Sequence, residues 1–467
     1  MKNLWFRNML DSIALQGREL IGLDNAERSQ QSIGTLCSQL LAGRGEASGI
    51  ALSQEILRRY SDLNNADKLS FFHILAMYFS PDLEAMQMAF RRYQKSLSAE
   101  DLIALNSTVE APRQELFRRL NMAPEGTANL VSLRADLLTV LTKNPTLKSL
   151  DADLKHLFSS WFNRGFLQLH SIDWKSPAYI LEKLINYESV HAIDGWDDLR
   201  RRLLKDRRCF AFFHPAMPDE PLIFIEVALV QGLSSKISVL IDPHAPVLDP
   251  ALADTAIFYS INNTQKGLRG ISFGNFLIKQ VLTELSAEFP ALRVLSTLSP
   301  LPTFADALHR WLKQTSDHQP NPMFDSILSS HHDALKQASV EPDFSTTLTD
   351  KDRLQNLFDD HLQESNVVAS NVLADLALAH LTPSDQQKRL TDPVALFHLA
   401  NGARLERINT FADMSLHGQA ISYGVMVNYL YDLRDVEVNH EAFVAEGKVR
   451  LSDALDKKLR QFKKSAA

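Results

Sequence analysis

Residues 255–281 read TAIFYSINNTQKGLRGISFGNFLIKQV, and this stretch decides the fold class of the second part of the chain. It opens on an apolar run rich in β-branched and aromatic residues, which is typical of a buried strand. A glycine-rich loop with the cations Lys266 and Arg269 follows, and a helical pattern begins directly after it. Glycines let backbone N–H groups approach a ligand, and helix N-termini attract anions. The order of strand, loop and helix therefore suits a bound pyrophosphate, although a plain connecting turn would show the same pattern.

The spacing of the glycines in this loop excludes two common kinds of phosphate site. A Walker loop needs Gly-Lys-Ser/Thr at the start of the helix, and the dinucleotide fingerprint needs glycines at other intervals. The segment instead resembles a loosened CoA loop of acetyltransferases, Arg/Gln-x-x-Gly-x-Gly, with Arg269, Ser272 and Gly274 at its fixed positions. This similarity would imply a CoA ester as the ligand, whereas the pattern alone favours a turn that only joins the strand to the helix.

Strand and helix patterns alternate around this stretch. Apolar runs rich in β-branched residues predict further strands at 208–214, 222–230, 236–241 and 292–299. Helical spacing predicts helices at 273–285 and 303–314. Such alternation is typical of an α/β sheet in which at least some strands pair in parallel.

The N-terminal third has a different pattern. From the start of the chain to about Trp174 it is helical almost throughout, because apolar residues return every three or four positions. Ser80-Pro81-Asp82 predicts a break after which a new helix begins. Polar helical segments return around 320–385 and predict an insertion or a lid. We therefore expect an all-α domain over 1–175 and an α/β domain over 176–467.

Composition limits the partners and the compartment. The chain has 467 residues, of which 45% are hydrophobic and 22% charged, and its net charge is -7. A negative net charge argues against nucleic acid as the main partner. No apolar run is long enough to cross a bilayer, and the acidic Asp11 and Glu19 do not fit a transit peptide. The two distant cysteines exclude a disulfide framework and favour a reducing compartment, so we expect a cytoplasmic location.

Several residues outside the loop are candidates for chemistry. Ser299 ends a predicted strand, where ligands of α/β sheets usually lie, yet Ser before Pro is also a common turn initiator. His398 lies at an apolar helix end, where histidines are also common packing residues. His214 stands in a proline-rich turn, for which we expect a structural role. The adjacent His331 and His332 have no spaced partners, so we predict no metal site.

Four further motifs occur in a fixed order along the chain. They are WKSPAYILEKLINYESVHAI-x-x-WDDLRRRL at 174–203, HPAMPDEPL at 214–222, LSPLP at 298–302 and FHL-x-NGA-x-x-x-RIN-x-x-AD-x-S-x-x-G at 397–418. Together with TAIFYSI-x-x-TQ-x-GL-x-G-x-x-x-G-x-x-LIK at 255–279, their order and spacing resemble the malonyl-CoA decarboxylase family. The resemblance covers about residues 165–433. The N-terminal third is similar to the family only as a helical domain of comparable size.

The resemblance implies a fold and a set of site residues. The family has a helical domain that mediates self-association, followed by a catalytic domain of acetyltransferase-like fold. Ser299 and His398 fall on the family's catalytic serine and histidine, and Ser260 falls on a serine near the acyl group. The family's CoA-binding loop falls on Arg269, Gly270, Ile271, Ser272, Phe273, Gly274 and Asn275.

The implied reaction is decarboxylation of malonyl-CoA to acetyl-CoA and CO2 without a cofactor, because the thioester carbonyl accepts the electrons that CO2 leaves behind. His398 would donate a proton to carbon, and Ser299 would position the malonyl carboxylate or relay the proton. The implied assembly is a homo-oligomer, a dimer or a tetramer formed through the helical domain. Two alternatives stay open: a CoA-dependent acyltransferase on the same fold, and a CoA-ester-binding scaffold without activity.

The chain departs from the family pattern at a few positions. Some members carry a glutamate in place of Ser272, and Thr303 and Thr410 stand where Gly and Trp are expected. None of these changes touches Ser299 or His398. The last residues, Ser465-Ala466-Ala467, lack the peroxisomal Ser-Lys-Leu signal of some eukaryotic members, which agrees with the expected cytoplasmic location.

Overall fold

The computed structural model describes residues 12–14, 16, 31–43, 45–271, 276–312, 322–338, 367–382 and 390–466. The chain clusters into two compact units. The first, called here the helical unit, combines Met1–His170 with Phe212–Ile223 and Asn263–Gly274. The second, called the sheet unit, combines Ser171–Ala211, Phe224–Asn262 and Asn275–Ala467. Each unit is described by itself.

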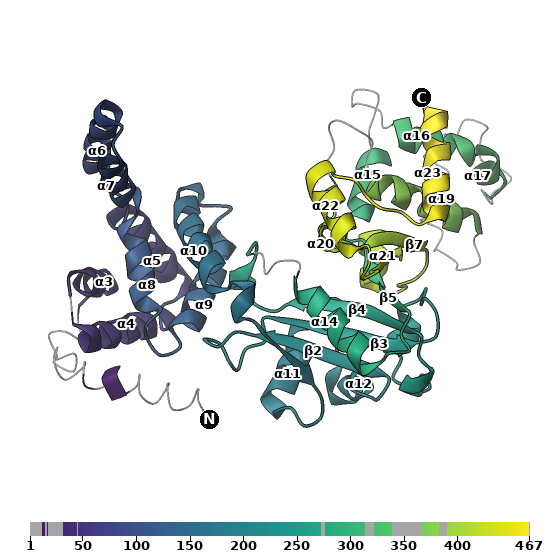
Figure 1. Cartoon of the computed structure of the whole chain (residues 1–467), viewed down its shortest axis with the longest axis horizontal. Helices are drawn as coiled ribbons and strands as arrows, with labels where there is room; N and C mark the ends of the chain where they lie inside the picture. The colour runs from purple at the N-terminus through teal and green to yellow at the C-terminus, as the bar shows by residue number, and fades with distance from the viewer. Residues whose placement is uncertain are drawn as a thin grey trace. The chain divides into compact units, whose positions relative to one another are not determined.

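The helical unit is built from helices that follow one another along the chain (Figure 1). Its helices are α3 (Ile33–Ala42), α4 (Glu46–Ser61), α5 (Asn65–Tyr78), α6 (Leu83–Ser96), α7 (Ala99–Val109), α8 (Pro112–Leu120), α9 (Gly126–Val140) and α10 (Lys148–Trp161), with the 3₁₀ turns η1 (Pro145–Leu147), η2 (Arg164–Phe166) and η4 (Lys266–Leu268). The predicted break before α6 is confirmed, because Asp82 caps the new helix and accepts hydrogen bonds from the N–H groups of Glu84 and Ala85. The core of this unit includes the fully buried rings of Phe71, Phe117 and Phe158.

Eight strands form one sheet within the described residues (Figure 1). They are β1 (Gln168–Ile172), β2 (Arg207–Phe213), β3 (Ile223–Val230), β4 (Thr255–Asn263), β5 (Val294–Thr297), β6 (Ser299–Pro300), β7 (Arg404–Asn409) and β8 (Met426–Leu430). Their order is β1-β2-β3-β4-β5-β8-β6, with β7 paired to β8. Strands β4 and β5 pair in parallel, as predicted, and α14 (Phe276–Glu288) lies between them in the chain. The predicted order, a helical region followed by an α/β region, is confirmed.

The sheet unit carries helices before, between and after its strands. They are α11 (Ala178–Tyr187), α12 (Gly195–Arg202), α13 (Ser238–Ile241), α14, α15 (Phe304–Leu312), α16 (Pro322–Ser330), α17 (His332–Ala338), α19 (Val367–Leu381), α20 (Pro393–Ala400), α21 (Leu416–Ser422), α22 (Val436–Glu446) and α23 (Asp453–Ala466), with η3 (Pro250–Leu252). The described parts of the expected insertion around 320–385 are the helices α16, α17 and α19. None of the described helices is long and apolar enough to cross a membrane.

One predicted strand is broken next to Ser299, a residue of the candidate site. The strand predicted at 292–299 is interrupted at Leu298, so that β5 ends at Thr297 and Ser299 begins the short β6. Strand β8 runs antiparallel to both pieces, pairing Ser296 with Leu430 and Ser299 with Val427. The backbone N–H of Leu298 still donates to Phe258 of β4, which ties the break to the parallel pair.

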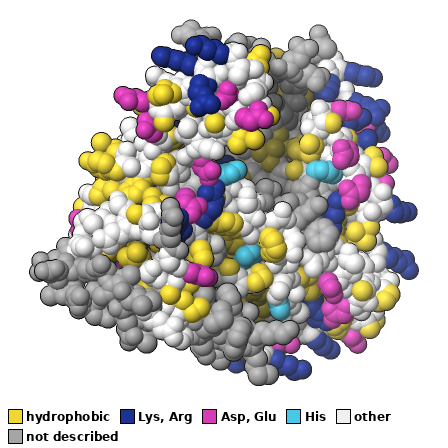
Figure 2. All heavy atoms as spheres, turned by 60° about the vertical axis from the view of Figure 1, so that its left-hand side comes forward, with side chains coloured by type: hydrophobic (Ala, Val, Ile, Leu, Met, Phe, Trp, Pro, Cys, Tyr) yellow, Lys and Arg dark blue, Asp and Glu magenta, His cyan; other side chains and the backbone are white. Residues whose placement is uncertain are grey.

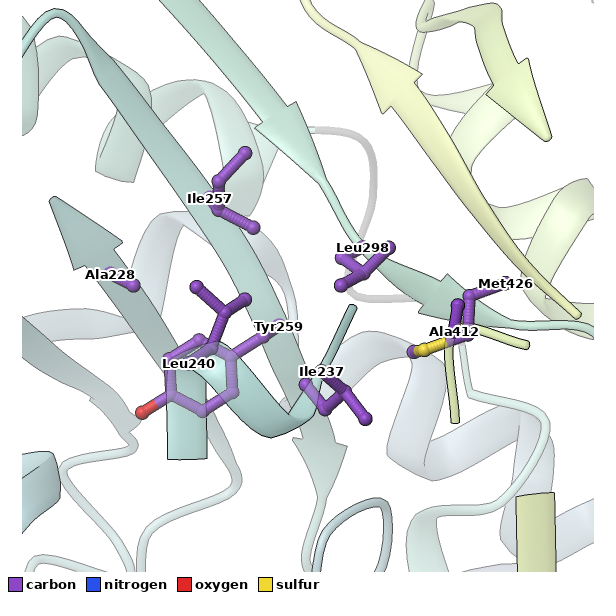
Figure 3. Packing of buried hydrophobic residues seen from close by; sticks show 8 residues of the cluster. All are labelled: Ala228, Ile237, Leu240, Ile257, Tyr259, Leu298, Ala412 and Met426. Carbon is purple, nitrogen blue, oxygen red and sulfur yellow. The ribbon is translucent and has the colours of Figure 1, made fainter. Parts of the chain in front are cut away.

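Buried apolar side chains from several elements hold this break in place. Figure 3 shows Leu298 beside a cluster that includes β3, β4 and β8 residues. The cluster consists of Ala228, Ile237, Leu240, Ile257, Tyr259, Leu298, Ala412 and Met426. Burial of this apolar surface stabilises the sheet unit next to Ser299, because each buried side chain is removed from water.

Two local predictions were wrong. The β-branched run at 236–241 is not a strand: Ser238–Ile241 form the short helix α13, and the N–H of Ile237 donates to Ala412 instead of to a neighbouring strand. Strand β1 lies in the region predicted to be purely helical. Its residues are mostly exposed, so the sequence lacks the apolar alternation that marks a half-buried strand.

Candidate active site

The structure brings Ser299 and His398 together although they lie 99 residues apart in the chain. Ser299 Oγ lies 3.0 Å from Nε2 of His398. Ser299 begins β6 and His398 lies in the last turn of α20, and both side chains are buried, with 6% and 3% of their surface exposed. A hydroxyl and an imidazole at hydrogen-bond distance in a buried site can exchange a proton.

The carboxylate of Asp392 connects the two elements that carry this pair. Its Oδ1 caps α20 by accepting hydrogen bonds from the N–H groups of Val394 and Ala395, at 3.0 and 2.9 Å. Its Oδ2 accepts from the N–H and the Oγ1 of Thr303, at 3.1 and 2.8 Å, in the turn that follows β6. Asp392 is fully buried. One side chain therefore fixes the start of α20 against the end of β6.

Two tyrosines contact the imidazole of His398: Tyr429 lies in β8, and Tyr431 follows the end of this strand. Nδ1 lies 2.9 Å from the hydroxyl of Tyr431, and the ring stacks on that of Tyr429 with 4.7 Å between centroids. Burial lowers the pKa of His398 to about 3, because the charged imidazolium has lost its water. His398 is therefore a neutral imidazole near neutral pH. Burial also raises the pKa of Tyr431, so its hydroxyl keeps its proton.

The neutral imidazole can direct its single N–H in two ways. With the proton on Nε2, His398 donates to Ser299 Oγ and accepts from Tyr431, and the serine hydroxyl can donate to a bound ligand. With the proton on Nδ1, His398 donates to Tyr431 and accepts the proton of Ser299. Protonation of the imidazole would make both nitrogens donors, and the serine hydroxyl would again point its proton toward the ligand.

Strand β8 is anchored by buried polar side chains where β5 stops. Asn428 Nδ2 donates to the carbonyl of Thr297 at 2.6 Å, and Thr297 Oγ1 accepts from the N–H of Tyr429 at 3.1 Å. Asn428 and Thr297 are fully buried. These bonds fix the strand on which Tyr429 lies, and through it the ring stacked on His398.

Ser260 lies in a separate cluster of hydrogen bonds. Its Oγ donates to Glu188 Oε2 at 2.7 Å, and Asn262 Nδ2 donates to the same oxygen at 2.8 Å. Glu188 Oε1 accepts from the N–H groups of Val190 and His191. Among the described residues, the hydrogen bonds of Ser260 therefore lead to Glu188 and Asn262 and not to Ser299 or His398.

The predicted CoA loop is described in part. Arg269, Gly270 and Ile271 lie in the helical unit directly after η4, while Ser272, Phe273, Gly274 and Asn275 lie outside the described residues. Gly270 has a φ of 77°, which an L-amino acid with a Cβ rarely adopts. The side chain of Arg269 is exposed to solvent.

The remaining histidines of the sequence analysis have protein partners. Nε2 of His214 lies 3.1 Å from the carbonyl of Trp161, and the N–H of Ala216 donates to its Nδ1, so this ring orders its turn. His331 pairs with Asp375 at 2.9 Å. The described residues contain no group of three or more His, Cys, Asp or Glu side chains that could hold a metal ion.

Sequence reasoning did not single out Asp392, Tyr429 and Tyr431. The first has a local signal, because Asp before Pro at the start of an apolar helix is typical of a helix N-cap. The tyrosines are spaced two residues apart, as are residues on one face of a strand. No local signal shows that these residues meet His398.

The buried Ser–His pair of the sheet unit is typical of an enzyme. Comparison with known families specifies which one. The model of the malonyl-CoA decarboxylase N-terminal domain matches residues 79–162, and that of the malonyl-CoA decarboxylase C-terminal domain matches residues 165–467. The chain therefore belongs to the malonyl-CoA decarboxylase family, as the resemblance predicted.

Individual relatives agree with this assignment. The chain is 36% identical to "Malonyl-CoA decarboxylase, mitochondrial" of Anser anser anser over 379 residues, which cover 79% of this chain and 73% of the relative. The crystal structure of the malonyl-CoA decarboxylase from Rhodopseudomonas palustris is 44% identical, with a TM-score of 0.79 over 91% of this chain and 98% of that one. The malonyl-CoA decarboxylase from Agrobacterium vitis is also 44% identical, with a TM-score of 0.77 over 92% and 99%.

The lowered pKa of His398 predicts a pH-dependent contribution to stability. The unfolded chain, with a histidine pKa of about 6.5, binds more protons than the folded chain between pH 6.5 and the folded value of about 3. Burial of the neutral His398 therefore leaves the free energy of unfolding at its full value above pH 6.5. Below that pH the free energy of unfolding decreases, by up to about 1.4 kcal/mol per pH unit. His398→Asn should therefore lose less stability than the parent when urea unfolding is repeated from pH 7.5 to pH 5. Ser299→Ala keeps the buried imidazole and should keep the parent's slope; equal slopes for the parent and His398→Asn would contradict the assignment.

Proposed function

We propose that this chain decarboxylates malonyl-CoA to acetyl-CoA and CO2, with Ser299 and His398 as its catalytic residues. The observation that carries the proposal is the buried hydrogen bond of 3.0 Å between Ser299 Oγ and His398 Nε2, in a chain of the malonyl-CoA decarboxylase family. The proposal goes beyond family membership because it assigns a role to each of these two side chains.

Decarboxylation of malonyl-CoA requires few groups from the protein. The bond between the carboxylate carbon and the methylene carbon breaks, and its electron pair moves onto the thioester carbonyl to give an enolate. A proton delivered to the methylene carbon then completes acetyl-CoA. The protein has to stabilise the enolate oxygen with hydrogen-bond donors and supply one proton, and a serine hydroxyl backed by a histidine offers both.

The source of the proton follows from the burial of His398. In the free protein the imidazole is neutral, because its pKa is lowered to about 3. A malonyl carboxylate that binds beside it brings a negative charge into the same buried place, and a nearby opposite charge raises the pKa of a histidine. His398 then takes up a proton together with the substrate. Nε2–H donates to Ser299 and Nδ1–H to Tyr431, and Ser299 relays its own proton to carbon. The imidazole is neutral again when acetyl-CoA has formed.

The loop from Arg269 to Asn275 has a separate role in the proposal, which is to bind the phosphates of CoA. Its support is the glycine-rich sequence, the exposed guanidinium of Arg269 and the positive φ of Gly270. Ser260 keeps a proposed place near the acyl group through the resemblance alone, since its hydrogen bonds lead to Glu188 and Asn262.

Substitution of the pair tests the catalytic assignment. His398→Asn should lower kcat for CO2 and acetyl-CoA formation by roughly 10²–10⁴, the usual contribution of a positioned acid. Ser299→Ala should cost a similar factor, and the double variant should be little worse than the worse single one, because both residues serve one unit. Tyr431→Phe should cost less, since it removes a contact to the imidazole and not the imidazole itself. Tyr78→Phe, an exposed tyrosine, is the matched control.

These variants also separate the alternatives. Turnover is compared per folded molecule, with melting temperature measured on each variant. Normal turnover in either single variant removes that residue from the mechanism. Transfer of the acyl group to an acceptor without release of CO2 would instead identify a CoA-dependent acyltransferase, and tight binding of malonyl-CoA without any product would identify a scaffold.

Proton uptake on ligand binding tests directly whether His398 becomes protonated. An analogue of malonyl-CoA with a sulfonate in place of the carboxylate keeps the charge but cannot lose CO2. Calorimetric titration at pH 7.5 in two buffers of different ionisation enthalpy should show an uptake of about one proton per site. Acetyl-CoA, which lacks the carboxylate, should cause none, and neither should the analogue with His398→Asn. Full uptake by the His398→Asn variant would contradict the proposal.

The helical unit supports the further proposal of a homo-oligomer. Its helices α6 and α7 expose many large apolar side chains: Leu83, Met88, Phe90, Leu97, Leu102, Ile103 and Val109. In Figure 2, hydrophobic side chains gather in patches on the face that is turned forward. Large exposed apolar patches are typical of protein interfaces, and a second copy of this chain offers the same helices.

Charge placed on these helices should disrupt the assembly. Met88→Glu combined with Ile103→Glu puts two carboxylates among the exposed apolar residues, and a desolvated charge opposes association. Light scattering during size-exclusion chromatography should then report a smaller species than the parent. Leu416→Glu, at an exposed leucine of α21 in the sheet unit, should keep the parent's state. A parent that is already monomeric would refute the oligomer.

We also propose the cytoplasm as the location. Its support is the small number of cysteines: Cys37 and Cys209 are both buried and form no disulfide with each other. The relatives from Anser anser anser and Mus musculus are named as mitochondrial proteins. Fractionation of cells that express the chain tests whether it is found in the cytoplasm.

A further inference from the structure

Helices α9 and α10 contact the described part of the glycine-rich loop, residues 266–271. Arg134 of α9 is almost completely buried, with 2% of its surface exposed. Its Nη1 donates to the backbone carbonyls of Gly267 at 2.6 Å and of Arg269 at 3.0 Å. Its Nε donates to Asp151 of α10 at 2.8 Å, which compensates the buried charge. A guanidinium with three fixed partners thus joins both helices to the loop.

The loop lies so close to α9 that one of its residues has to be glycine. A Cβ on Gly267 would lie 1.8 Å from the carbonyl oxygen of Val131, which no side chain can tolerate. The loop and the helices belong to the same compact unit. The conformation of residues 266–271 is therefore determined by contacts with α9 as well as by their own sequence.

The hydrogen bond to the Arg269 carbonyl also sets the direction of the next N–H group. In a trans peptide the C=O and the N–H point in opposite directions, so the N–H of Gly270 points away from Arg134. Among the described residues, this N–H donates to no acceptor, whereas those of Arg269 and Ile271 donate to Lys266 and Leu268. Arg134 therefore presents one free backbone donor of the loop to solvent.

A lysine of α10 lies beside the same peptide. Nζ of Lys155 is 3.6 Å from the position that a Cβ on Gly270 would take. Lys155 is exposed, and within the described ranges no carboxylate pairs with it. Lys266 and Arg269 of the loop are also exposed. A free N–H with one lysine beside it and two further cations within four residues in the chain suits an anion of high charge, such as a diphosphate or a phosphate monoester.

We propose that the helical domain supplies part of the CoA phosphate site: Lys155 binds a phosphate directly, and Arg134 is the positioning residue that orients the loop. The identity of the ligand as a CoA ester rests on the proposed function, whereas the anion site rests on the geometry of the loop, α9 and α10. The helical domain then takes part in substrate binding, in addition to any role in assembly.

Binding measurements on the full chain test the proposal. Lys155→Ala should weaken the binding of CoA about threefold to tenfold in titration calorimetry at low salt, and the difference should shrink as salt screens the charges. Lys155→Arg should restore most of the affinity. Pantetheine, which lacks the phosphates, should bind all variants equally. The ratio of CoA to 3′-dephospho-CoA affinity tells which phosphate Lys155 contacts: a loss confined to CoA indicates the 3′-phosphate, and a loss with both indicates the diphosphate.

Lys148→Ala is the matched control, because Lys148 is an exposed lysine on the same helix, about 10 Å further along it. Arg134→Lys keeps a charge for Asp151 but cannot reach both carbonyls, so it should raise KM with little change in kcat. Equal CoA affinity in Lys155→Ala and Lys148→Ala overturns the proposal, as does a parent that binds CoA no better than pantetheine. A parent that binds CoA through Lys155 but releases no CO2 would overturn the proposed function and leave this inference standing.

Discussion

The buried carboxylate of Asp392 accepts hydrogen bonds from the first turn of α20 and from Thr303, and these bonds hold His398 beside Ser299. Ser299 lies on a two-residue strand and His398 on a two-turn helix, neither of which would keep its place alone. Loss of this carboxylate would remove the acceptor of four hydrogen bonds at once. The Ser–His distance on which the proposed chemistry depends is thus set by a residue that takes no part in it.

Burial gives the same site its electrostatic character. A histidine without water around it stays neutral until an anion arrives, so the acid of the proposed reaction forms only when the substrate carboxylate is in place. The tyrosines help because they surround the imidazole without adding charge: Tyr429 stacks on it and Tyr431 offers a hydroxyl that can donate or accept. A carboxylate in the place of Tyr431 would charge the histidine permanently and remove this coupling.

In the proposed phosphate site, contacts within the helical unit restrict the backbone that would bind the anion. A loop rich in glycine has many conformations, and binding a phosphate with it costs conformational entropy unless something else restricts it. Arg134 and the close contact of Gly267 with Val131 provide that restriction from α9. The two family models match residues 79–162 and 165–467, so these bonds join a residue of the first matched region, Arg134, to backbone carbonyls of the second.

The sequence by itself determined the features that depend on neighbours in the chain. Helical and strand periodicity, the helix break at Ser80-Pro81-Asp82, the order of strand, loop and helix over 255–281 and the family motifs are local patterns. Together they predicted a helical region followed by an α/β region. Only the tertiary structure decided that 236–241 contains a helix, that the strand breaks at Leu298, and that Asp392, Tyr429 and Tyr431 surround the Ser–His pair. These outcomes depend on contacts between segments tens to hundreds of residues apart, and the free energy of such contacts overrides local propensity without leaving a trace in the local pattern.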